Sequence, residues 1–156
     1  MITLRPVGLD QYATLAHLRV RDEQIKYAGT LREAFETGEK DVDFHAIEWD
    51  GAPVGFFKID RAYPAEYDFA CDGEIGLRGF LIDASRQGQG IASAAVLALP
   101  AYLTGQYPLA SAVVLSVNCA NPAAIRCYLK GGFVDTGDLY QLGRAGPQHV
   151  MRMTLG

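Results

Sequence analysis

The chain has 156 residues, of which 49% are hydrophobic and 21% charged, and its formal net charge is −4. This length and apolar content suit one domain with one buried core, so a single domain is expected over residues 1–156. The mild acidity argues against a nucleic-acid-binding surface, and no apolar run approaches the roughly 20 residues that a membrane-spanning helix needs.

The N-terminal part of the chain predicts one strand followed by two helices. Ile2 to Pro6 predicts a short strand, and the apolar spacing from Asp10 to Val20 predicts a first helix. A second helix is expected between Asp22 and Gly38, with Thr30 as its N-cap.

The middle of the chain predicts a hairpin and then a further strand. Asp43 to Trp49 and Val54 to Ile59 have the pattern of strands joined by a tight Asp50-Gly51 turn. Glu74 to Ile82 is a largely apolar run that predicts a third strand in this region.

A glycine-rich loop, Arg86 to Ala92, follows this last strand and precedes a helix-forming run. Glycines let the main chain approach an anion closely, and the first free N–H groups of a helix point at that anion. The loop therefore predicts a phosphate-binding site. A nucleotide-binding P-loop would need a Lys after its glycine, and a dinucleotide fingerprint would need a third glycine where Ser93 stands.

The helix after the loop is expected over Ala92 to Leu103, with Pro100 kinking or ending it. Val113 to Val117 predicts a buried strand because it is rich in β-branched residues. Strand, helix and strand in this order imply a parallel pair joined by a right-handed crossover.

The last helix has clear start and stop signals. Asn121 is a typical N-cap followed by Pro122, and Gly131-Gly132 ends the helix. Two closing strands are expected at Phe133-Val134 and Val150–Met153, with a glycine-rich stretch between them. The element order is then β-α-α-β-β-β-α-β-α-β-β. It predicts an α/β fold with a mixed sheet of about six or seven strands and helices on both faces.

Two motifs resemble the GNAT superfamily of N-acetyltransferases. Gln87-Gly88-Gln89-Gly90-Ile91-Ala92 fits the pattern Gln/Arg-x-x-Gly-x-Gly/Ala of its motif A. The segment Asn121 to Phe133 is similar to the superfamily pattern Asn-x-x-Ala-x-x-x-Tyr-x-x-x-Gly-Phe, with Asn121 and Tyr128 two helical turns apart. The order and separation of the two motifs also match. The resemblance implies a GNAT-like fold.

The resemblance implies acetyl-CoA as cosubstrate and no metal. The strands Glu74–Asp83 and Val113–Val117 would splay apart and hold the pantetheine arm between them. Main-chain groups of one strand would bind that arm, those of the loop would bind the pyrophosphate, and an asparagine would reach the arm. The cofactor-binding residues are then Phe80, Leu81, Ile82, Gln87, Gly88, Gln89, Gly90, Ile91, Ala92, Ser93 and Asn121.

The implied reaction is direct transfer of the acetyl group to a primary amine. Tyr128 would protonate the departing thiolate, and a main-chain N–H of the Phe80–Ile82 segment would polarise the acetyl carbonyl. Glu74, on the strand leading to the acetyl group, is the carboxylate predicted to receive the proton of the amine, directly or through waters. A solvated residue that opens a strand is the other interpretation of Glu74.

The local sequences Phe80-Leu81-Ile82-Asp83 and Leu115-Ser116-Val117 resemble those of bacterial diamine and polyamine acetyltransferases, although Gly79 and Gly132 depart from them. Glu23 and Tyr27 would then bind the amine. Two other functions stay open: acetylation of a protein N-terminus or lysine, and non-catalytic sensing of acyl-CoA. A homodimer is left open, because dimers are common in the superfamily.

The cysteines and the first residues bear on the compartment. Cys71, Cys119 and Cys127 are odd in number and widely spaced, which disfavours disulfides and a zinc site. No basic region followed by an apolar stretch begins the sequence, so no signal peptide is expected and the cytoplasm is the expected location. No membrane or nucleic-acid partner is expected, and the three histidines are expected to be structural.

Overall fold

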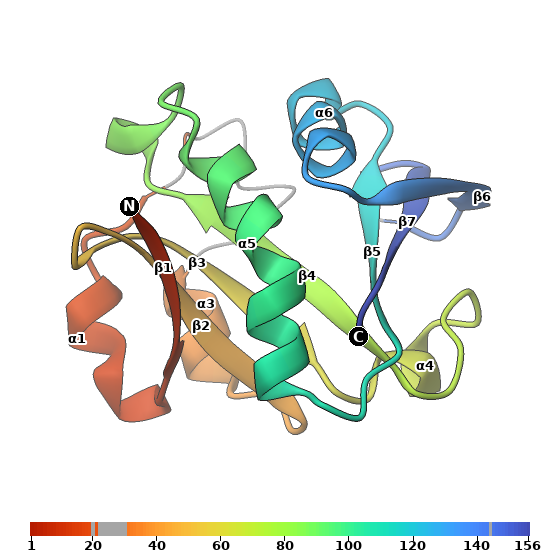
Figure 1. The fold of residues 1–156 in the computed structure, drawn as a ribbon, viewed down its shortest axis with the longest axis horizontal. Coiled ribbons are helices and arrows are strands. Elements are labelled where there is room, and N and C mark those ends of the chain that lie inside the picture. Colours follow the sequence, from red (N-terminus) through yellow and green to blue (C-terminus); the bar gives the residue numbers. More distant parts are fainter. Residues whose placement is uncertain (20, 22–30, 144) are drawn as a thin grey trace.

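The computed structural model describes residues 1–19, 21, 31–143 and 145–156. Seven strands form one sheet in the order β1-β2-β3-β4-β5-β7-β6 (Figure 1). β4 and β5 run parallel, and the five other neighbouring pairs are antiparallel. The strands are β1 (Ile2–Val7), β2 (Val42–Trp49), β3 (Ala52–Asp60), β4 (Glu74–Ile82), β5 (Ala112–Asn118), β6 (Val134–Tyr140) and β7 (Gln148–Thr154).

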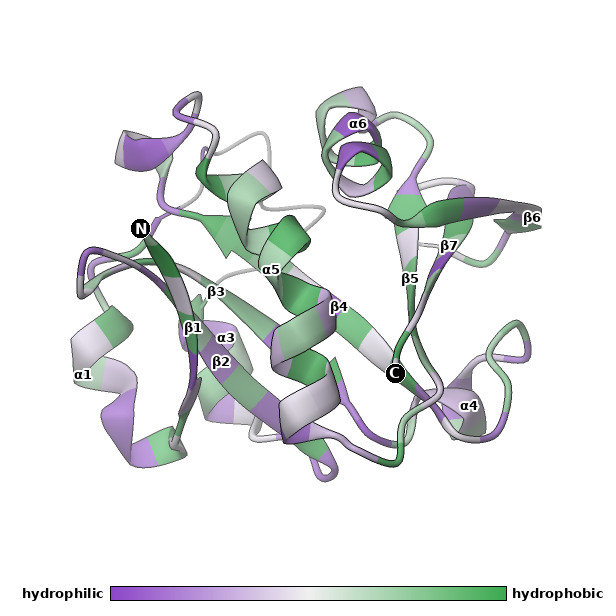
Figure 2. Ribbon diagram, viewed as in Figure 1, coloured by the Kyte–Doolittle hydropathy of each residue, from purple (hydrophilic) through white to green (hydrophobic). Residues whose placement is uncertain are grey.

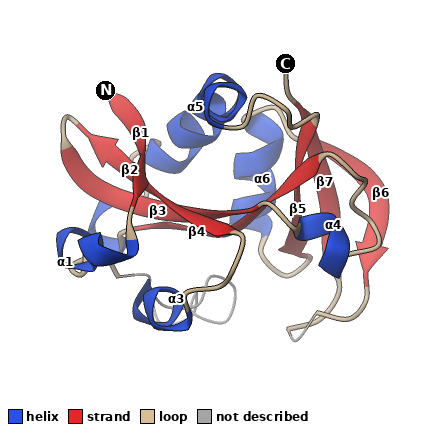
Figure 3. Ribbon diagram, turned by 90° about the horizontal axis from the view of Figure 1, so that it is seen from below, coloured by secondary structure: helices blue, strands red, loops and turns tan. Residues whose placement is uncertain are grey.

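Helices cover both faces of this mixed sheet, as the sequence predicts (Figure 3). α5 and α6 pack on one face, named here the α5 face, around the larger core cluster. α1 and α3 pack on the opposite face, named here the α3 face. The helices are α1 (Tyr12–Leu15), α3 (Leu31–Thr37), α4 (Tyr63–Glu66), α5 (Ile91–Gln106) and α6 (Pro122–Lys130), with 3₁₀ turns at Leu9–Gln11 and Ala84–Arg86.

Two local predictions from the sequence are confirmed. The turn between β2 and β3 has positive φ at both of its central residues, 48° at Asp50 and 85° at Gly51, as a tight hairpin between twisted strands requires. α6 begins at Pro122, and the side chain of Asn121 accepts a hydrogen bond from the N–H of Ala124 at 3.4 Å. Both elements therefore follow from local turn and cap chemistry.

α5 does not end at Pro100, and the prediction that it stops near Leu103 is wrong. A proline inside a helix costs about 3 kcal/mol, because one hydrogen bond is lost. Tertiary contacts offset this cost: Leu99 and Leu103 are fully buried, and the hydroxyl of Tyr102 lies 2.6 Å from Nδ1 of buried His45. Among the described helices, none has both the length and the apolar content that crossing a bilayer requires.

The first helix is shorter than Asp10 to Val20. A 3₁₀ turn and the four residues of α1 form, and the chain then leaves the helical path. The reason is tertiary, because the N–H of Arg19 donates to Oδ1 of Asp83 at 2.7 Å and Leu18 is buried. The predicted N-cap at Thr30 lies outside the described residues.

The C-terminal strand β6 extends into the stretch that was expected to be a glycine-rich loop. It contains Gly137, which has a φ of +86°, and its pairing with β7 is interrupted between Asp135 and Leu139. The short helix α4, between β3 and β4, was not predicted either. Its Tyr63 is buried on the sheet, so burial of one aromatic ring orders this segment.

Candidate active site

β4 and β5 form a V that is closed where both strands begin. The parallel ladder has three pairs and ends at Gly76 and Val114. Beyond this pair, residues 77–82 of β4 and 115–118 of β5 are not paired with each other. Figure 1 shows the two strands diverging, with the start of α5 near the end of β4 and α6 beside β5. The facing main-chain groups can therefore bind an extended ligand.

A bulge in β4 accompanies this divergence. Gly79 has a φ of +59°, and the register with β3 slips by one residue at this point. Ile75 and Leu77 contribute to the core of the α5 face before the bulge, and Phe80 and Ile82 contribute after it. The apolar alternation in the sequence shifts by one at Gly79, so the signal for the bulge was present.

The glycine loop has the geometry of an anion site. Gly88 and Gly90 both have a φ of +78°, a conformation that favours glycine, and Gly90 has no side-chain cap to offer α5. No N–H from Gly88 to Ser93 donates to another described residue. α5 itself carries no charged side chain (Figure 2). The loop and the dipole of α5 are compatible with a bound diphosphate, and its binding there stays a prediction.

Side chains at the start of the loop fix its position. Nε2 of Gln87 donates to the carbonyl oxygen of Ile82 at 3.0 Å, and the hydroxyl of Ser85 donates to Asp83. Nε of Arg86, at the start of the loop, is buried and has no hydrogen-bond partner among the described residues. The side chain of Gln87 therefore positions the loop, and the carbonyl oxygen of Ile82 accepts this one hydrogen bond. Phe80, Leu81 and Ile82 stay predicted contacts of the arm.

Tyr128 stands where the two motifs meet. Its ring centroid lies 6.0 Å from that of Phe80 on β4 and 5.5 Å from that of Phe133. Burial raises the pKa of the Tyr128 phenol, so this phenol is neutral at physiological pH. Its hydroxyl bonds to no other residue in the described parts of the chain. Next to it, burial raises the pKa of the Cys127 thiol, and Ser93 in the first turn of α5 is close enough to lower it in part.

Asn121 and Glu74 have structural partners. Asn121 caps α6, as its local sequence indicates, and its contact with a pantetheine arm stays a prediction. Glu74 lies in the closed end of the V, where Arg152 donates to both carboxylate oxygens at 2.6 and 3.0 Å. The N–H of Cys71 donates to the same carboxylate, and these bonds outweigh desolvation and hold the pKa of Glu74 below its usual range. This arrangement argues against Glu74 as a base.

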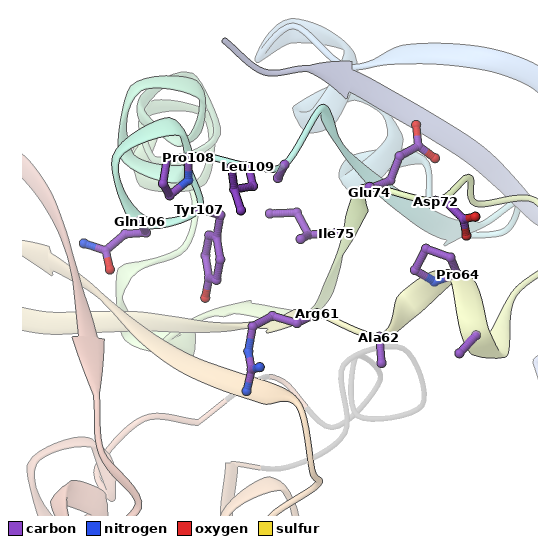
Figure 4. A pocket seen from close by; sticks show the side chains of 13 residues that line it. Arg61, Ala62, Pro64, Asp72, Glu74, Ile75, Gln106, Tyr107, Pro108 and Leu109 are labelled. Carbon is purple, nitrogen blue, oxygen red and sulfur yellow. The ribbon is translucent and has the colours of Figure 1, made fainter.

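Two surface cavities lie away from the wide end of the V. One of about 580 Å³ is bordered by the start of β4, the C-terminal end of α5 and the α4 segment (Figure 4). In that view Ile75 and Leu109 lie along its wall, and the carboxylate of Glu74 is turned away from its centre. A second cavity, of about 470 Å³, shares Gln106 and Tyr107 with it. The predicted amine ligands Glu23 and Tyr27 lie outside the described residues.

The family of the chain follows from its sequence. Residues 11–133 match the family model described as "Acetyltransferase (GNAT) family". The chain belongs to this family. The prediction drawn from the two motifs is thereby confirmed, and most of the GNAT chain, from before α1 to Phe133, is covered by the match. Within the described residues, no group of three metal-ligating side chains is present.

Known proteins similar to this GNAT chain include an acetyltransferase of Bacillus subtilis. It is the uncharacterized N-acetyltransferase YbbJ, 31% identical over 103 residues, which are 65% of the present chain and 64% of YbbJ. The match thus spans less than two thirds of that relative's length.

Solved structures share the fold over nearly the whole chain. Aminoglycoside acetyltransferase AAC(6')-Ib, crystallised with coenzyme A and kanamycin, has a TM-score of 0.79 at 24% identity, covering 99% of this chain and 95% of that chain. A chimera of the spermidine N-acetyltransferase SpeG from Vibrio cholerae and hSSAT has a TM-score of 0.73 at 17% identity, covering 98% and 95%. At these identities the likeness shows a common fold, which confirms the predicted GNAT-like architecture.

Proposed function

We propose that the chain transfers an acetyl group from acetyl-CoA directly to a primary amine, and that one domain over residues 1–156 carries the whole site. The proposed acceptor is a small molecule, a diamine or polyamine. The observation that carries the proposal is the V between β4 and β5, with free amides at its wide end and Tyr128 on its wall. The similar structures named for aminoglycoside and spermidine acetylation support a small amine.

Each part of the site has a role in this reaction. Acetyl-CoA, when bound, supplies an acetyl group activated as a thioester. The amides from Gly88 to Ser93 hold its diphosphate, and the free edges of β4 and β5 hold its arm. A main-chain N–H of the bulged segment at Phe80 polarises the acetyl carbonyl, because an oriented donor in a dry site stabilises developing negative charge. Oη of Tyr128 gives its proton to the departing thiolate, while the proton lost by the attacking amine passes to water, from which the tyrosinate is protonated again.

Two measurements on the purified chain test this function. Calorimetry with CoA should give a dissociation constant between about 1 μM and 1 mM, the range in which enzymes commonly hold their substrates. Thiol release from acetyl-CoA should then appear with spermidine or kanamycin, and it should be far slower with a neutral peptide as acceptor.

The alternatives predict other results. Release with a peptide alone would identify a protein or peptide acetyltransferase, and CoA binding without release to any acceptor would identify a sensor. No CoA binding at millimolar concentration, by a folded chain, would contradict the proposed function altogether.

A further inference from the structure

An aromatic cluster covers the α3 face of the sheet at the closed end of the V. It consists of Tyr63, Tyr67 and Phe69, which lie between β3 and β4, and Tyr140 at the end of β6. Centroids of neighbouring rings are 4.6 to 5.8 Å apart. Tyr63 is buried, whereas Tyr67, Phe69 and Tyr140 are partly exposed. The exposed rings are therefore available to a ligand.

The cluster touches both arms of the V. The ring of Tyr63 lies over Gly76, where an added Cβ would come within 2.1 Å of its Cδ1. Burial raises the pKa of the Tyr63 phenol, and Ser116 on β5 is close enough to this phenol to lower it in part. Gly76 and Val114 form the last pair of the parallel ladder, and Val114 packs into the cluster. An acceptor that reaches the V from the α3 face, opposite Tyr128, would therefore pass these rings.

The charges around the exposed rings favour a cation. Burial raises the pKa of the Tyr67 phenol, and Arg78 is the cation whose charge lowers it in part. Arg78 is paired with Glu39 at 2.8 Å and with Asp60 at 3.2 Å. The carboxylate of Glu66 is close enough to Tyr67 to raise the pKa of its phenol further. Exposed Asp68 stands between Tyr67 and Phe69 in the chain. Arg152 is paired with Glu74, which raises its pKa, and Asp138, two residues before Tyr140, is close enough to raise it further.

An aromatic face attracts a cation, because its π-system carries negative charge above the ring. The amine nitrogen that attacks the acetyl group must be neutral, since a protonated nitrogen has no lone pair to give. A cation held by the rings must therefore be a different group of the same acceptor. We propose that Tyr67, Phe69 and Tyr140, with Glu66 and Asp138, bind a second ammonium group of the acceptor. This inference rests on the proposed function.

The proposal limits the substrate to amines that carry at least one further positive charge. Putrescine and n-butylamine are a matched pair of probes, because they have the same carbon chain and differ in one amino group. The wild-type chain should give a higher kcat/KM with putrescine. Tyr67→Leu and Tyr140→Leu should each reduce that preference by about 2- to 30-fold, mainly through KM, the range that cation–π contacts support.

The matched controls keep the ring. Tyr67→Phe and Tyr140→Phe should retain the wild-type preference, and CoA affinity should be the same in all four variants. If Tyr67→Leu fails to fold, Tyr140→Leu on the outermost strand serves alone. Equal kcat/KM for both amines in the wild type, or an undiminished preference in the Leu variants, would each overturn the inference. Such results leave CoA binding intact, so they differ from a failure of the proposed function.

Discussion

Tyr128 combines a raised pKa with a hydroxyl that bonds to no other described residue. A phenol in this state can give a proton and cannot accept one. A thiol has a pKa of about 8.5, so the departing thiolate is a fair leaving group without help. The proton from Tyr128 is therefore expected to assist the reaction late, rather than to make it possible.

Tyr128→Phe should accordingly lower kcat by about 10²-fold, in the range of one proton-transfer contribution. CoA affinity should stay at the wild-type value, because the ring contacts with Phe80 and Phe133 are kept. Thiol release and calorimetry measure the two quantities. Tyr12→Phe on α1 is the control and should leave kcat unchanged. Wild-type kcat in Tyr128→Phe would remove the hydroxyl from the chemistry.

Glu74 has a partner that could not be predicted from its position in the sequence. Its place at the start of the strand before the loop suggested a base, but its partner Arg152 is 78 residues away in the chain. The ion pair keeps the carboxylate charged and occupied. Tyr128, in contrast, lies two helical turns after Asn121 in a motif that could be recognised from the sequence. In the structure its ring contacts Phe80 of β4.

At the scale of elements, the glycine loop and α5 form one unit. An added Cβ at Gly88 would meet no atom within 4 Å, so its φ of +78° is the sole local reason for glycine. Gly105, inside the same helix, also has open space around it and does not have this strained φ. The two positions are therefore a matched pair for separating loop conformation from bulk.

Gly88→Ala should weaken CoA binding by about 5- to 30-fold, because a left-handed backbone costs a non-glycine residue about 1–2 kcal/mol. Gly105→Ala should leave CoA affinity unchanged and stabilise the fold by about 0.5–1 kcal/mol, through lower chain entropy in the unfolded state. Calorimetry and urea unfolding give both values. A folded Gly88→Ala variant with wild-type CoA affinity would rule the loop out as the diphosphate site.

At the scale of the whole molecule, His45 connects β2 to α5. Its ring nitrogens lie 2.6 Å from the hydroxyl of Tyr102 and 2.9 Å from that of Tyr107, which donates to Asp43 at 2.7 Å. This places the His45 proton on Nε2, because Tyr107 must accept there. The ring also stacks on Phe57. His45 is 1% exposed, and burial lowers its pKa to about 4.

The lowered pKa makes the stability of the fold depend on pH. The unfolded chain binds a proton at His45 below about pH 6.5, and the folded chain binds it only below about pH 4. His45 therefore makes its full contribution to the free energy of unfolding above pH 6.5. This contribution, about 3 kcal/mol at most, is lost as the pH falls to 4. Urea unfolding at pH 7, 6, 5 and 4 measures the slope.

His45→Gln should be less stable at pH 7 and should show a smaller loss between pH 6.5 and 4.5. His17→Gln, at an exposed position, should keep the wild-type slope. An unchanged slope in His45→Gln would show that other groups cause the dependence. Glu39 and Glu74, whose pKa values are lowered, contribute losses below about pH 4.5, so the comparison is made above that value.

Sequence alone determined the elements whose signals are local. The Asp50-Gly51 hairpin, the Asn121 cap and the glycine loop before α5 depend on neighbouring residues, and so does the recognition of the family. The tertiary structure decided what depends on distant partners: the continuation of α5 past Pro100, the end of α1, the pairing of Glu74 with Arg152, and the rings gathered over Gly76. Such contacts join residues far apart in the chain, and no local pattern encodes them.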